Sequence, residues 1–263
     1  MIKIIQTDKT FNWGDVNEIR ALRGIDLDIM EGEFVTVIGS NGAGKSTILN
    51  LLAGVYPPDS GEIWIGERNV TRWPEHQRAK LIGRVFQDPL RGTAGSMSIE
   101  ENMAMALLRG KPRGLVRGVS QTGRNHFRQE LLQLGLGLED RLTGKVNLLS
   151  GGQRQALTLI MATLVKPRIL LLDEHTAALD PGMAEQISRI TARLVKEHNL
   201  TALMVTHNMQ QALSMGSRTL MMHQGEIILD LRGEERSRLT VNELVRKFAE
   251  IRKDALDDEL LLS

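Results

Sequence analysis

The stretch Gly39-Ser40-Asn41-Gly42-Ala43-Gly44-Lys45-Ser46 decides the fold of this chain, because it fits the pattern G-x-x-x-x-G-K-[ST]. It follows an apolar run, residues 34–38, that indicates a strand. It precedes residues 45–53, whose apolar positions recur with a helical period. Glycines allow the backbone to turn so that its N–H groups point at phosphate oxygens, and the start of a helix adds partial positive charge. The sequence therefore predicts a strand, a phosphate-binding loop and a helix in succession.

Three side chains at the start of this predicted helix have expected roles in holding a nucleotide. Lys45 is expected to reach the β- and γ-phosphates, Ser46 to ligate Mg²⁺ through its hydroxyl, and Thr47 to hydrogen-bond the α-phosphate. The alternative is a glycine-rich turn before an ordinary helix. The strand expected before the loop and the helix expected after it favour phosphate binding. The predicted phosphate site comprises Gly39, Ser40, Asn41, Gly42, Ala43, Gly44, Lys45, Ser46 and Thr47.

The composition of the 263-residue chain is that of an ordinary globular protein, with 41% hydrophobic and 25% charged residues. The net charge is +1, so no overall imbalance of charge indicates nucleic acid as a partner, and none is expected. The absence of cysteine excludes disulfides and cysteine-based metal or thiol chemistry. No apolar run approaches the ~20 residues of a membrane span, and the first residues lack a secretory signal pattern. If the protein serves a membrane, we expect it to do so from the aqueous side.

Short apolar runs alternate with helical patterns along the chain. This alternation predicts an α/β fold with a mixed, mainly parallel sheet, while the first strands and the last hairpin are expected to be antiparallel. One domain is expected over residues 1–232, with a helical subdomain at about 90–160, followed by a C-terminal helix and acidic tail at 233–263. Strands are predicted at 2–5, 25–29, 34–38, 62–65, 83–86, 168–172, 202–205, 219–222 and 226–229, and helices at 45–53, 99–108, 126–134, 153–165, 181–197 and 241–251.

Residues 109–128 form a basic, glycine-containing segment with two open interpretations. The first is an exposed, mobile loop. The second is a contact with lipid headgroups or with an acidic surface of a partner. Its basic residues are Arg109, Lys111, Arg113, Arg117, Arg124 and Arg128.

Asp173 and Glu174 follow the apolar run 169–172, which predicts a buried strand that ends in two acids. Downstream of a phosphate loop, Asp173 is expected to hold Mg²⁺. Glu174 is expected to lie beside the γ-phosphate and to polarise the attacking water as a general base. Adjacent acids suit two tasks because successive side chains on an extended strand point in different directions.

The stretch Leu149-Ser150-Gly151-Gly152-Gln153 lies about 20 residues before this strand. Read locally, Ser150 caps a helix, and the glycines allow close approach to the N–H groups of its first turn. In a chain with the phosphate loop and the two acids, this stretch resembles the signature of the ATP-binding-cassette (ABC) ATPases. The resemblance covers about residues 2–232. It implies a P-loop NTPase core, an antiparallel β subdomain and a helical signature subdomain, and it implies that Ser150, Gly151, Gly152 and Gln153 bind a γ-phosphate held by a second copy of the chain.

Three further positions match the ABC pattern in the expected order. Gln87 matches the glutamine that senses Mg²⁺ and the attacking water and couples to the transporter. Asp180, in Ala178-Leu179-Asp180, matches the D-loop aspartate that touches the opposite site. His207 matches the switch histidine, for which the resemblance implies contact with the γ-phosphate and stabilisation of transition-state charge. Taken singly, Gln87 would be interpreted as a polar turn residue and His207 as a structural histidine.

An aromatic residue near the N-terminus is expected to stack on adenine. Phe11 matches the family's A-loop aromatic, while Trp13, two residues later, is the alternative, and Val16 is a candidate apolar neighbour of the ring. One departure from the family is visible. His175 follows the catalytic acid where proline is usual, and it either is simply tolerated or changes the rigidity or pH sensitivity of the loop.

The resemblance implies an enzyme that hydrolyses ATP with Mg²⁺ and powers a membrane ABC transporter. An importer is expected, and residues 173–181 resemble ATPases that accompany periplasmic-type binding proteins, some of them linked to amino acids. The expected partners are a second identical subunit, transmembrane permease subunits and an extracytoplasmic solute-binding protein, at the cytoplasmic face of the membrane. The alternative is a soluble ABC ATPase that remodels another complex, such as one that assembles cofactors.

Overall fold

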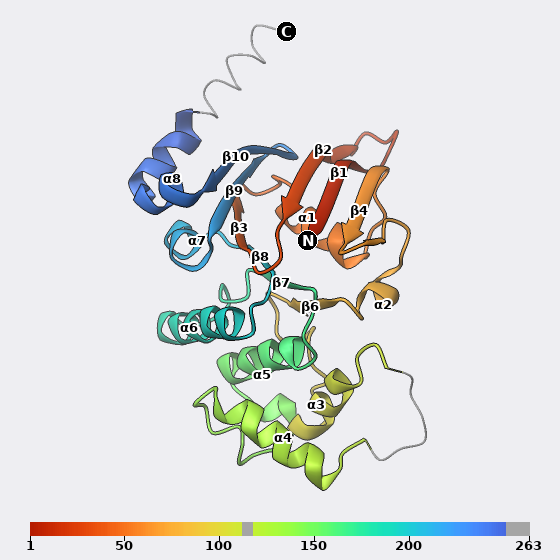
Figure 1. Ribbon diagram of the computed structural model, residues 1–263, viewed down its shortest axis with the longest axis vertical. Helices are drawn as coiled ribbons and strands as arrows, with labels where there is room; N and C mark the ends of the chain where they lie inside the picture. Colours follow the sequence, from red (N-terminus) through yellow and green to blue (C-terminus); the bar gives the residue numbers. More distant parts are fainter. Residues whose placement is uncertain (112–117, 251–263) are drawn as a thin grey trace, which may run out of the picture.

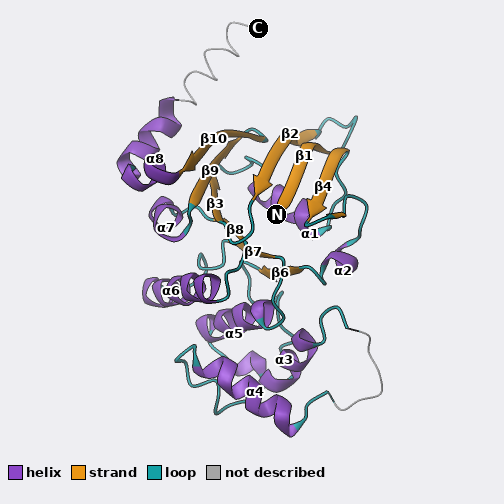
Figure 2. Cartoon of the chain, in the orientation of Figure 1, coloured by secondary structure: helices purple, strands orange, loops and turns teal. Residues whose placement is uncertain are grey.

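Two β-sheets and a group of helices make up the molecule (Figures 1 and 2). The computed structural model describes residues 1–111 and 118–250. Arg113 and Arg117 of the basic segment, Ile251 of the last predicted helix and the acidic tail therefore lie outside the described residues. Within the described residues, no helix has the length and apolar character needed to cross a membrane.

The six-stranded sheet has the order β10-β9-β3-β8-β7-β6 and is parallel except for β10. Its central strands are apolar on both faces and buried, as expected for a parallel sheet covered on both sides. The predicted α/β fold with a mixed, mainly parallel sheet is confirmed. The strands are β3 (Phe34–Gly39), β6 (Ile82–Val85), β7 (Ile169–Asp173), β8 (Ala202–Val205), β9 (Arg218–His223) and β10 (Glu226–Arg232).

The second sheet is antiparallel and has the order β2-β1-β4-β5. Its first strand is longer than predicted, because register shifts after Ile4 interrupt the alternation of apolar and polar residues that a prediction depends on. Thr7 is buried in this irregular part, although the surrounding residues are polar. The strands are β1 (Ile2–Phe11), β2 (Ile19–Ile29), β4 (Ser60–Ile65) and β5 (Arg68–Asn69).

The helices cover both faces of the six-stranded sheet (Figure 1). The bounds predicted for α1 and α6 are those observed, whereas α2, α7 and α8 are short helices that the sequence pattern does not predict. A 3₁₀ turn at Val146–Leu148 precedes α5, and residues 241–250 are helical. The helices are α1 (Lys45–Ala53), α2 (Glu75–Arg78), α3 (Ile99–Leu107), α4 (Gln121–Leu132), α5 (Gly151–Thr163), α6 (Pro181–Glu197), α7 (Met209–Met215) and α8 (Gly233–Arg238).

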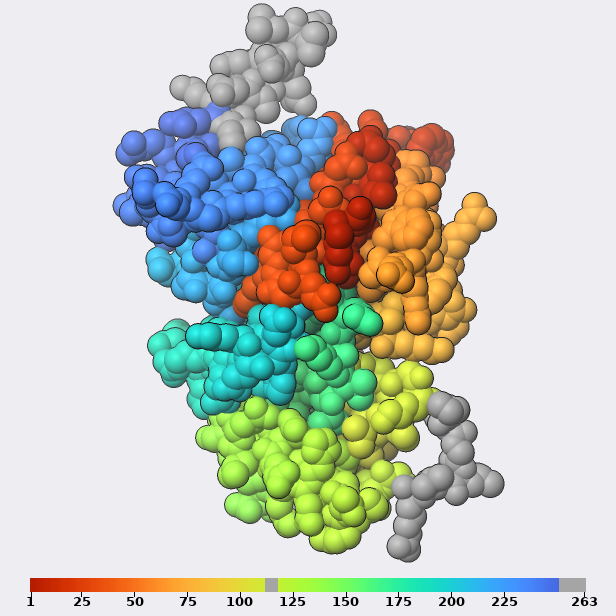
Figure 3. Space-filling model, viewed as in Figure 1, coloured from red at the N-terminus to blue at the C-terminus, as the bar shows by residue number. Residues whose placement is uncertain are grey.

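Two large apolar cores lie on opposite faces of the six-stranded sheet, because successive side chains of each strand point to opposite faces. Leu171 packs with α1 and the antiparallel sheet, whereas Leu170 and Leu172 pack with α3, α4, α5 and α6. The space-filling view shows the part of the chain that carries α3 and α4 at one end of the molecule, beyond α6 (Figure 3).

The basic segment is not simply a loop where it is described. Residues 121–128 belong to α4, and Arg124 makes a bidentate ion pair with Glu100 of α3, with N–O distances of 2.7 and 2.9 Å. Arg109 donates to the carbonyl of Ala162 at the end of α5. The loop interpretation is therefore wrong for residues 121–128, which are helical. Arg109 and Arg124 are used in contacts between helices, whereas Lys111 and Arg128 are exposed.

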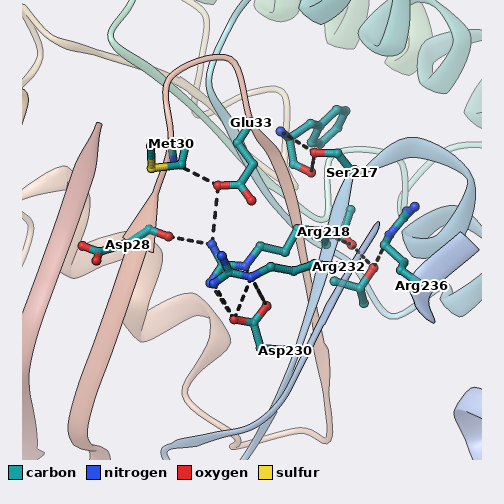
Figure 4. A network of polar contacts seen from close by, with 11 residues as sticks. Asp28, Met30, Glu33, Ser217, Arg218, Asp230, Arg232 and Arg236 are labelled. Carbon is teal, nitrogen blue, oxygen red and sulfur yellow. Dashed lines mark hydrogen bonds and ion pairs between the residues drawn. The ribbon is translucent and has the colours of Figure 1, made fainter. Parts of the chain in front are cut away.

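A buried arginine joins the two sheets (Figure 4). Arg218 of β9 is 2% exposed and makes two hydrogen bonds of 2.7 Å to the carboxylate of Asp230 on β10. It also donates to the backbone carbonyl of Asp28 on β2, at 2.6 Å, which belongs to the other sheet. Burial raises the pKa of Asp230, but hydrogen bonds from Arg218 and Arg232 outweigh it, so that the pKa falls to about 2. We call Arg218, together with Asp230 and the Asp28 carbonyl that it binds, the sheet clasp.

Candidate active site

The phosphate loop connects β3 to α1 in a backbone conformation that requires glycine at two points. Gly39 has φ 153° and Gly44 has φ 95°. A Cβ atom would lie 2.2 Å from the Met222 carbonyl oxygen at Gly39 and 2.5 Å from the Ala21 carbonyl oxygen at Gly44. Gly44 caps α1 without a side-chain hydrogen bond. The first turn of α1 is thus left open to an anion, as its N–H groups and dipole favour.

Lys45 lies across this loop. Its Nζ donates to the carbonyl oxygens of Gly39 at 3.0 Å and Ser40 at 2.8 Å, and the residue is only 5% exposed. Burial lowers the pKa of Lys45, while the negative charges of Glu174 and Asp173 act in the opposite direction. An ammonium group has three donors, so one remains for a phosphate oxygen in this arrangement.

The acids reach the same edge of the sheet as the phosphate loop because β3, β8 and β7 are adjacent parallel strands. Asp173 ends β7 and lies opposite Val205, the last residue of β8. The backbone N–H of Glu174 donates to the Val205 carbonyl at 3.0 Å. Glu174 has φ 44°, in the left-handed region that non-glycine residues rarely adopt. Strain of this kind costs about 1–3 kcal/mol and is concentrated at functional sites.

His207 and Glu174 are in direct contact. The distance from His207 Nε2 to Glu174 Oε1 is 2.5 Å, although 33 positions separate the two residues in the chain. The contact forms because β8 delivers the loop of His207 beside the end of β7. Glu174 is mostly shielded, at 12% side-chain exposure, while His207 is 48% exposed. The structure thus gathers Lys45, Asp173, Glu174 and His207 at one edge of the sheet.

Arg84 is a charged neighbour of Asp173 that the sequence reasoning missed. Its Nη2 lies 3.5 Å from Asp173 Oδ2 and 2.7 Å from the Asn50 side-chain oxygen on α1, and its guanidinium group lies over the Phe86 ring. Burial lowers the pKa of Arg84, and the charge of Asp173 opposes this. The signal available in the sequence is a single arginine within a short run predicted to be a strand.

Phe11 is the last residue of β1, in the antiparallel sheet. Its ring makes an edge-to-face contact with Tyr56, with centroids 5.2 Å apart at 80°, and it pairs across the strands with Ile19. Trp13 is 79% exposed and Val16 is fully exposed. Phe11 is therefore the better ordered aromatic platform of the two that the sequence offers. Tyr56, which follows α1, is a neighbour that the sequence reasoning missed.

The signature stretch begins α5 with a closed cap. Ser150 Oγ accepts from the Gln153 N–H and Gln153 Oε1 accepts from the Ser150 N–H, each at 3.2 Å. A Cβ atom at Gly152 would lie 2.2 Å from Met183 of α6, whereas Gly151 has no such close neighbour. Within the described residues, no hydrogen bond or ion pair joins 149–153 to the phosphate loop or to the acids. The structure does not bring this predicted part of the site together with the rest in one chain.

Gln87 follows β6, the parallel neighbour of β7, and so leaves the sheet at the same edge as Asp173, but no hydrogen bond or ion pair among the described residues joins Gln87 or Asp180 to the gathered residues. Gln87 is exposed after β6, and the carbonyl of the preceding Phe86 accepts from Gln155 of α5 at 3.1 Å. Asp180 caps α6 by accepting from the Met183 N–H at 3.0 Å. Both residues therefore have structural surroundings that tie their loops to helices.

His175 is buried at 2% exposure, and its Nε2 lies 3.1 Å from the hydroxyl of Thr191 on α6. Burial lowers the pKa of His175 to about 4. The ring is consequently neutral near pH 7 and supplies no pH sensitivity there. Its contact with α6 favours a role in fixing the loop after Glu174.

The residues present fit Mg²⁺ held together with nucleotide phosphates. The described residues contain no cluster of three or more His, Cys, Asp or Glu side chains that would form an all-protein metal site. Mg²⁺ is usually bound through one or two carboxylates plus substrate phosphates, and Asp173 and the Ser46 hydroxyl are oxygen donors of the right kind. Arg84, 3.5 Å away, contacts the carboxylate of Asp173 and helps to fix its orientation.

Comparison with known proteins places this geometry in a class. Residues 22–177 match the family model described as ABC transporter. The chain superimposes on a dimeric ATP-binding cassette in a post-hydrolysis state bound to ADP and phosphate, with a TM-score of 0.76, 31% identity and coverage of 88% of this chain and 98% of that one. This protein therefore belongs to the ABC transporter family and is an ATP-hydrolysing subunit of that class. The resemblance and the ATPase activity inferred from the sequence are confirmed.

Two relatives show how far the similarity extends. The chain is 43% identical over 250 residues to the tyrosine transport ATP-binding protein of Clostridioides difficile, covering 94% of this chain and 98% of that protein. It is 37% identical over 233 residues to the lipoprotein-releasing system ATP-binding protein of Syntrophus aciditrophicus, covering 87% and 99% respectively.

Proposed function

We propose that two copies of this chain form the ATP-driven motor of an importer for amino acids. The observation that carries the proposal is the separation of the site into two parts within one chain. Lys45, Asp173, Glu174 and His207 share one edge of the six-stranded sheet, while the first turn of α5 makes no polar contact with them. A second copy would supply the missing signature turn, as the dimeric state of the 31% identical cassette supports.

In the nucleotide-binding half, each end of ATP meets a different element. Phe11 stacks on adenine, and the backbone N–H groups of residues 39–47 surround the phosphates. Lys45 retains a donor for the β- and γ-phosphates beside its bonds to Gly39 and Ser40. Asp173, Ser46 and Gln87 would hold Mg²⁺, which would neutralise charge on the phosphates.

Hydrolysis begins with a water between Glu174 and the γ-phosphate. The carboxylate of Glu174 accepts a proton from this water as its oxygen attacks phosphorus, the bond to ADP breaks, and inorganic phosphate forms. His207 orients Glu174 through the 2.5 Å contact and faces the charge that develops on the γ-phosphate. The left-handed backbone at Glu174, held by its surroundings, directs the carboxylate away from the end of β7 toward this water.

The signature half closes the site. Ser150, Gly151, Gly152 and Gln153 of one copy bind the γ-phosphate held by the other, and Asp180 touches the opposite site. Gly151 is the open approach, since Gly152 already packs against Met183. Loss of phosphate removes the link between the copies, so that binding and hydrolysis become closing and opening of the dimer.

The motion is passed to permease subunits through the loop of Gln87. This loop lies between β6 and the helical group, and its backbone is tied to α5 through Gln155. In this proposal the two ATPase subunits bind the permease at the cytoplasmic face of the membrane, and an extracytoplasmic solute-binding protein belongs to the same system. The near full-length similarity to a tyrosine transport protein supports amino acids as the cargo class.

The test is isolation of the complex in its native membrane. A tagged chain is purified in mild detergent with ATP and Mg²⁺, and its partners are identified by mass spectrometry. We expect a polytopic membrane protein and ATPase activity that rises when a binding protein loaded with an aromatic amino acid is added. Recovery of soluble partners alone would overturn the transport proposal in favour of a remodelling ATPase.

A further inference from the structure

Gln211 lies in the first turn of α7 and joins three parts of the chain. Its side-chain Oε1 accepts from the hydroxyl of Thr206 at 2.7 Å. Its Nε2 donates to the hydroxyl oxygens of Thr176 at 3.1 Å and Ser188 at 2.9 Å. Both donors of the amide and one acceptor are therefore used in a half-buried position between elements.

The orientation of this amide follows from the surrounding hydrogen bonds. The hydroxyl of Ser188 donates its proton to the Ala184 carbonyl at 2.8 Å, so its oxygen is left to accept. Only the amide nitrogen of Gln211 can donate to it. The N–H of Gln211 itself donates to Asn208 Oδ1 at 2.9 Å, which fixes the start of α7.

The three partners lie next to the proposed catalytic residues. Thr206 immediately precedes His207, and Thr176 comes two residues after Glu174. Ser188 lies in α6, one turn before Thr191. The hydroxyl oxygen of Thr191 lies 3.1 Å from Nε2 of His175, the residue that follows Glu174. The segment after Glu174 is thus attached to one face of α6 directly through His175 and indirectly through Gln211, which also attaches the loop of His207 there.

We infer that Gln211 is a positioning residue for ATP hydrolysis, which keeps the loop of His207 and the segment after Glu174 in one fixed arrangement. This inference rests on the proposed roles of Glu174 and His207. Glu174 has left-handed backbone geometry, which persists only where its surroundings hold it. Without Gln211, Thr206 and Thr176 lose their shared hydrogen-bond partner. The loops that carry His207 and Glu174 are then no longer joined to each other through this side chain.

The test compares Gln211→Leu with the matched control Gln210→Leu, since Gln210 is the exposed neighbour on the same helix. Misplacement by about 1 Å costs roughly 100-fold in rate, so we expect kcat of Gln211→Leu to fall about 10- to 100-fold. The KM for ATP and the ATP-dependent dimer observed in the Glu174→Gln background should stay within about twofold. Gln211→Glu should recover part of the rate, because the hydroxyls of Thr206 and Thr176 are able to donate to a carboxylate, whereas the bond to Ser188 is lost.

Two further variants repeat the test from the loop side. Thr176→Val removes the hydroxyl and Thr176→Ser keeps it, so only the valine variant should lower kcat. The effect of Thr176→Val on kcat should vanish in the Gln211→Leu background, because both substitutions remove the same hydrogen bond between Gln211 and Thr176. A wild-type kcat in both Gln211→Leu and Thr176→Val, or a fall in kcat with an equal loss of nucleotide binding, would overturn the inference. Glu174→Gln is measured alongside: if it retains turnover, the proposed function fails instead.

Discussion

The first turns of α1 and α5 both lie beside or include glycines and both are expected to meet phosphate, yet their N–H groups are capped in opposite ways. The first turn of α1 has a glycine cap and no side-chain hydrogen bond, which leaves its N–H groups for a ligand. The first turn of α5 is closed by a reciprocal pair of hydrogen bonds between Ser150 and Gln153. A lone chain therefore offers one open anion site and one at which the N–H groups of Ser150 and Gln153 are already paired.

This difference indicates a division of labour. The open turn of α1, with Lys45 across it, should carry most of the affinity of a single subunit for ATP. The capped turn of α5 should add little until a second subunit presents a nucleotide to it. The four variants below test this division.

Glu174→Gln is expected to give the largest effect, a fall in turnover of about 10³-fold, because glutamine accepts no proton from water. Nucleotide binding should persist, and the bound ATP should hold a dimer. Steady-state phosphate release and size-exclusion chromatography check these two outcomes. Turnover at the wild-type rate would remove Glu174 from the catalytic step.

Ser150→Arg should prevent dimer formation at a cost of about 3 kcal/mol or more, because a bulky cation would occupy the closing surface. Binding of ATP by the single subunit should change less than twofold, as measured by fluorescence titration. Ser150→Ala is the matched control, since it removes the cap, worth about 1 kcal/mol, without adding bulk. A dimer formed by Glu174→Gln together with Ser150→Arg would contradict the assigned role of α5.

Lys45→Ala should weaken ATP binding by about 2 kcal/mol, roughly 30-fold, because a charge-assisted hydrogen bond to phosphate is lost. Isothermal titration with the monomeric Ser150→Arg form isolates this effect from dimerisation. Lys45→Met keeps the length of the side chain and should behave like alanine. If both variants bound ATP as tightly as the wild type, the contacts that give a single subunit its ATP affinity would lie elsewhere than at Lys45 and the start of α1.

Phe11→Ala should have the smallest effect, about 1 kcal/mol or roughly fivefold in ATP affinity, through the loss of stacking. Phe11→Tyr should retain binding, and Trp13→Ala should leave it unchanged because Trp13 is exposed. Competition between ATP and inorganic triphosphate measures the contribution of the base directly. A larger loss in Trp13→Ala than in Phe11→Ala would reverse the choice between the two aromatics.

The parts of the site that the sequence predicts are those written in consecutive residues. The phosphate loop, the pair Asp173 and Glu174, and the cap at Ser150 each occupy one short stretch and depend on local backbone geometry. The bounds of α1 and α6 are predicted for the same reason, since the helical period is uninterrupted in both.

The parts that the sequence does not reveal depend on the order of strands and on distant partners. Arg84 meets Asp173 only because β6 lies beside β7, and Gln211 meets Thr176 only because β8 brings α7 next to α6. The basic segment misleads for a related reason. Arg124 pairs with Glu100, 24 positions away, so a charge that suggests a loop belongs to a contact between helices.

The sheet clasp has a consequence for the kind of molecule that fits the site (Figure 4). Phe11, which we propose stacks on adenine, is on the antiparallel sheet, whereas the phosphate loop follows a strand of the other sheet. Arg218, bonded at once to Asp28 in one sheet and Asp230 in the other, resists sliding of either sheet past its neighbour. We therefore expect the distance between a base at Phe11 and phosphates at Lys45 to be set within a single subunit, so that selection for nucleotides of matching length precedes dimer formation.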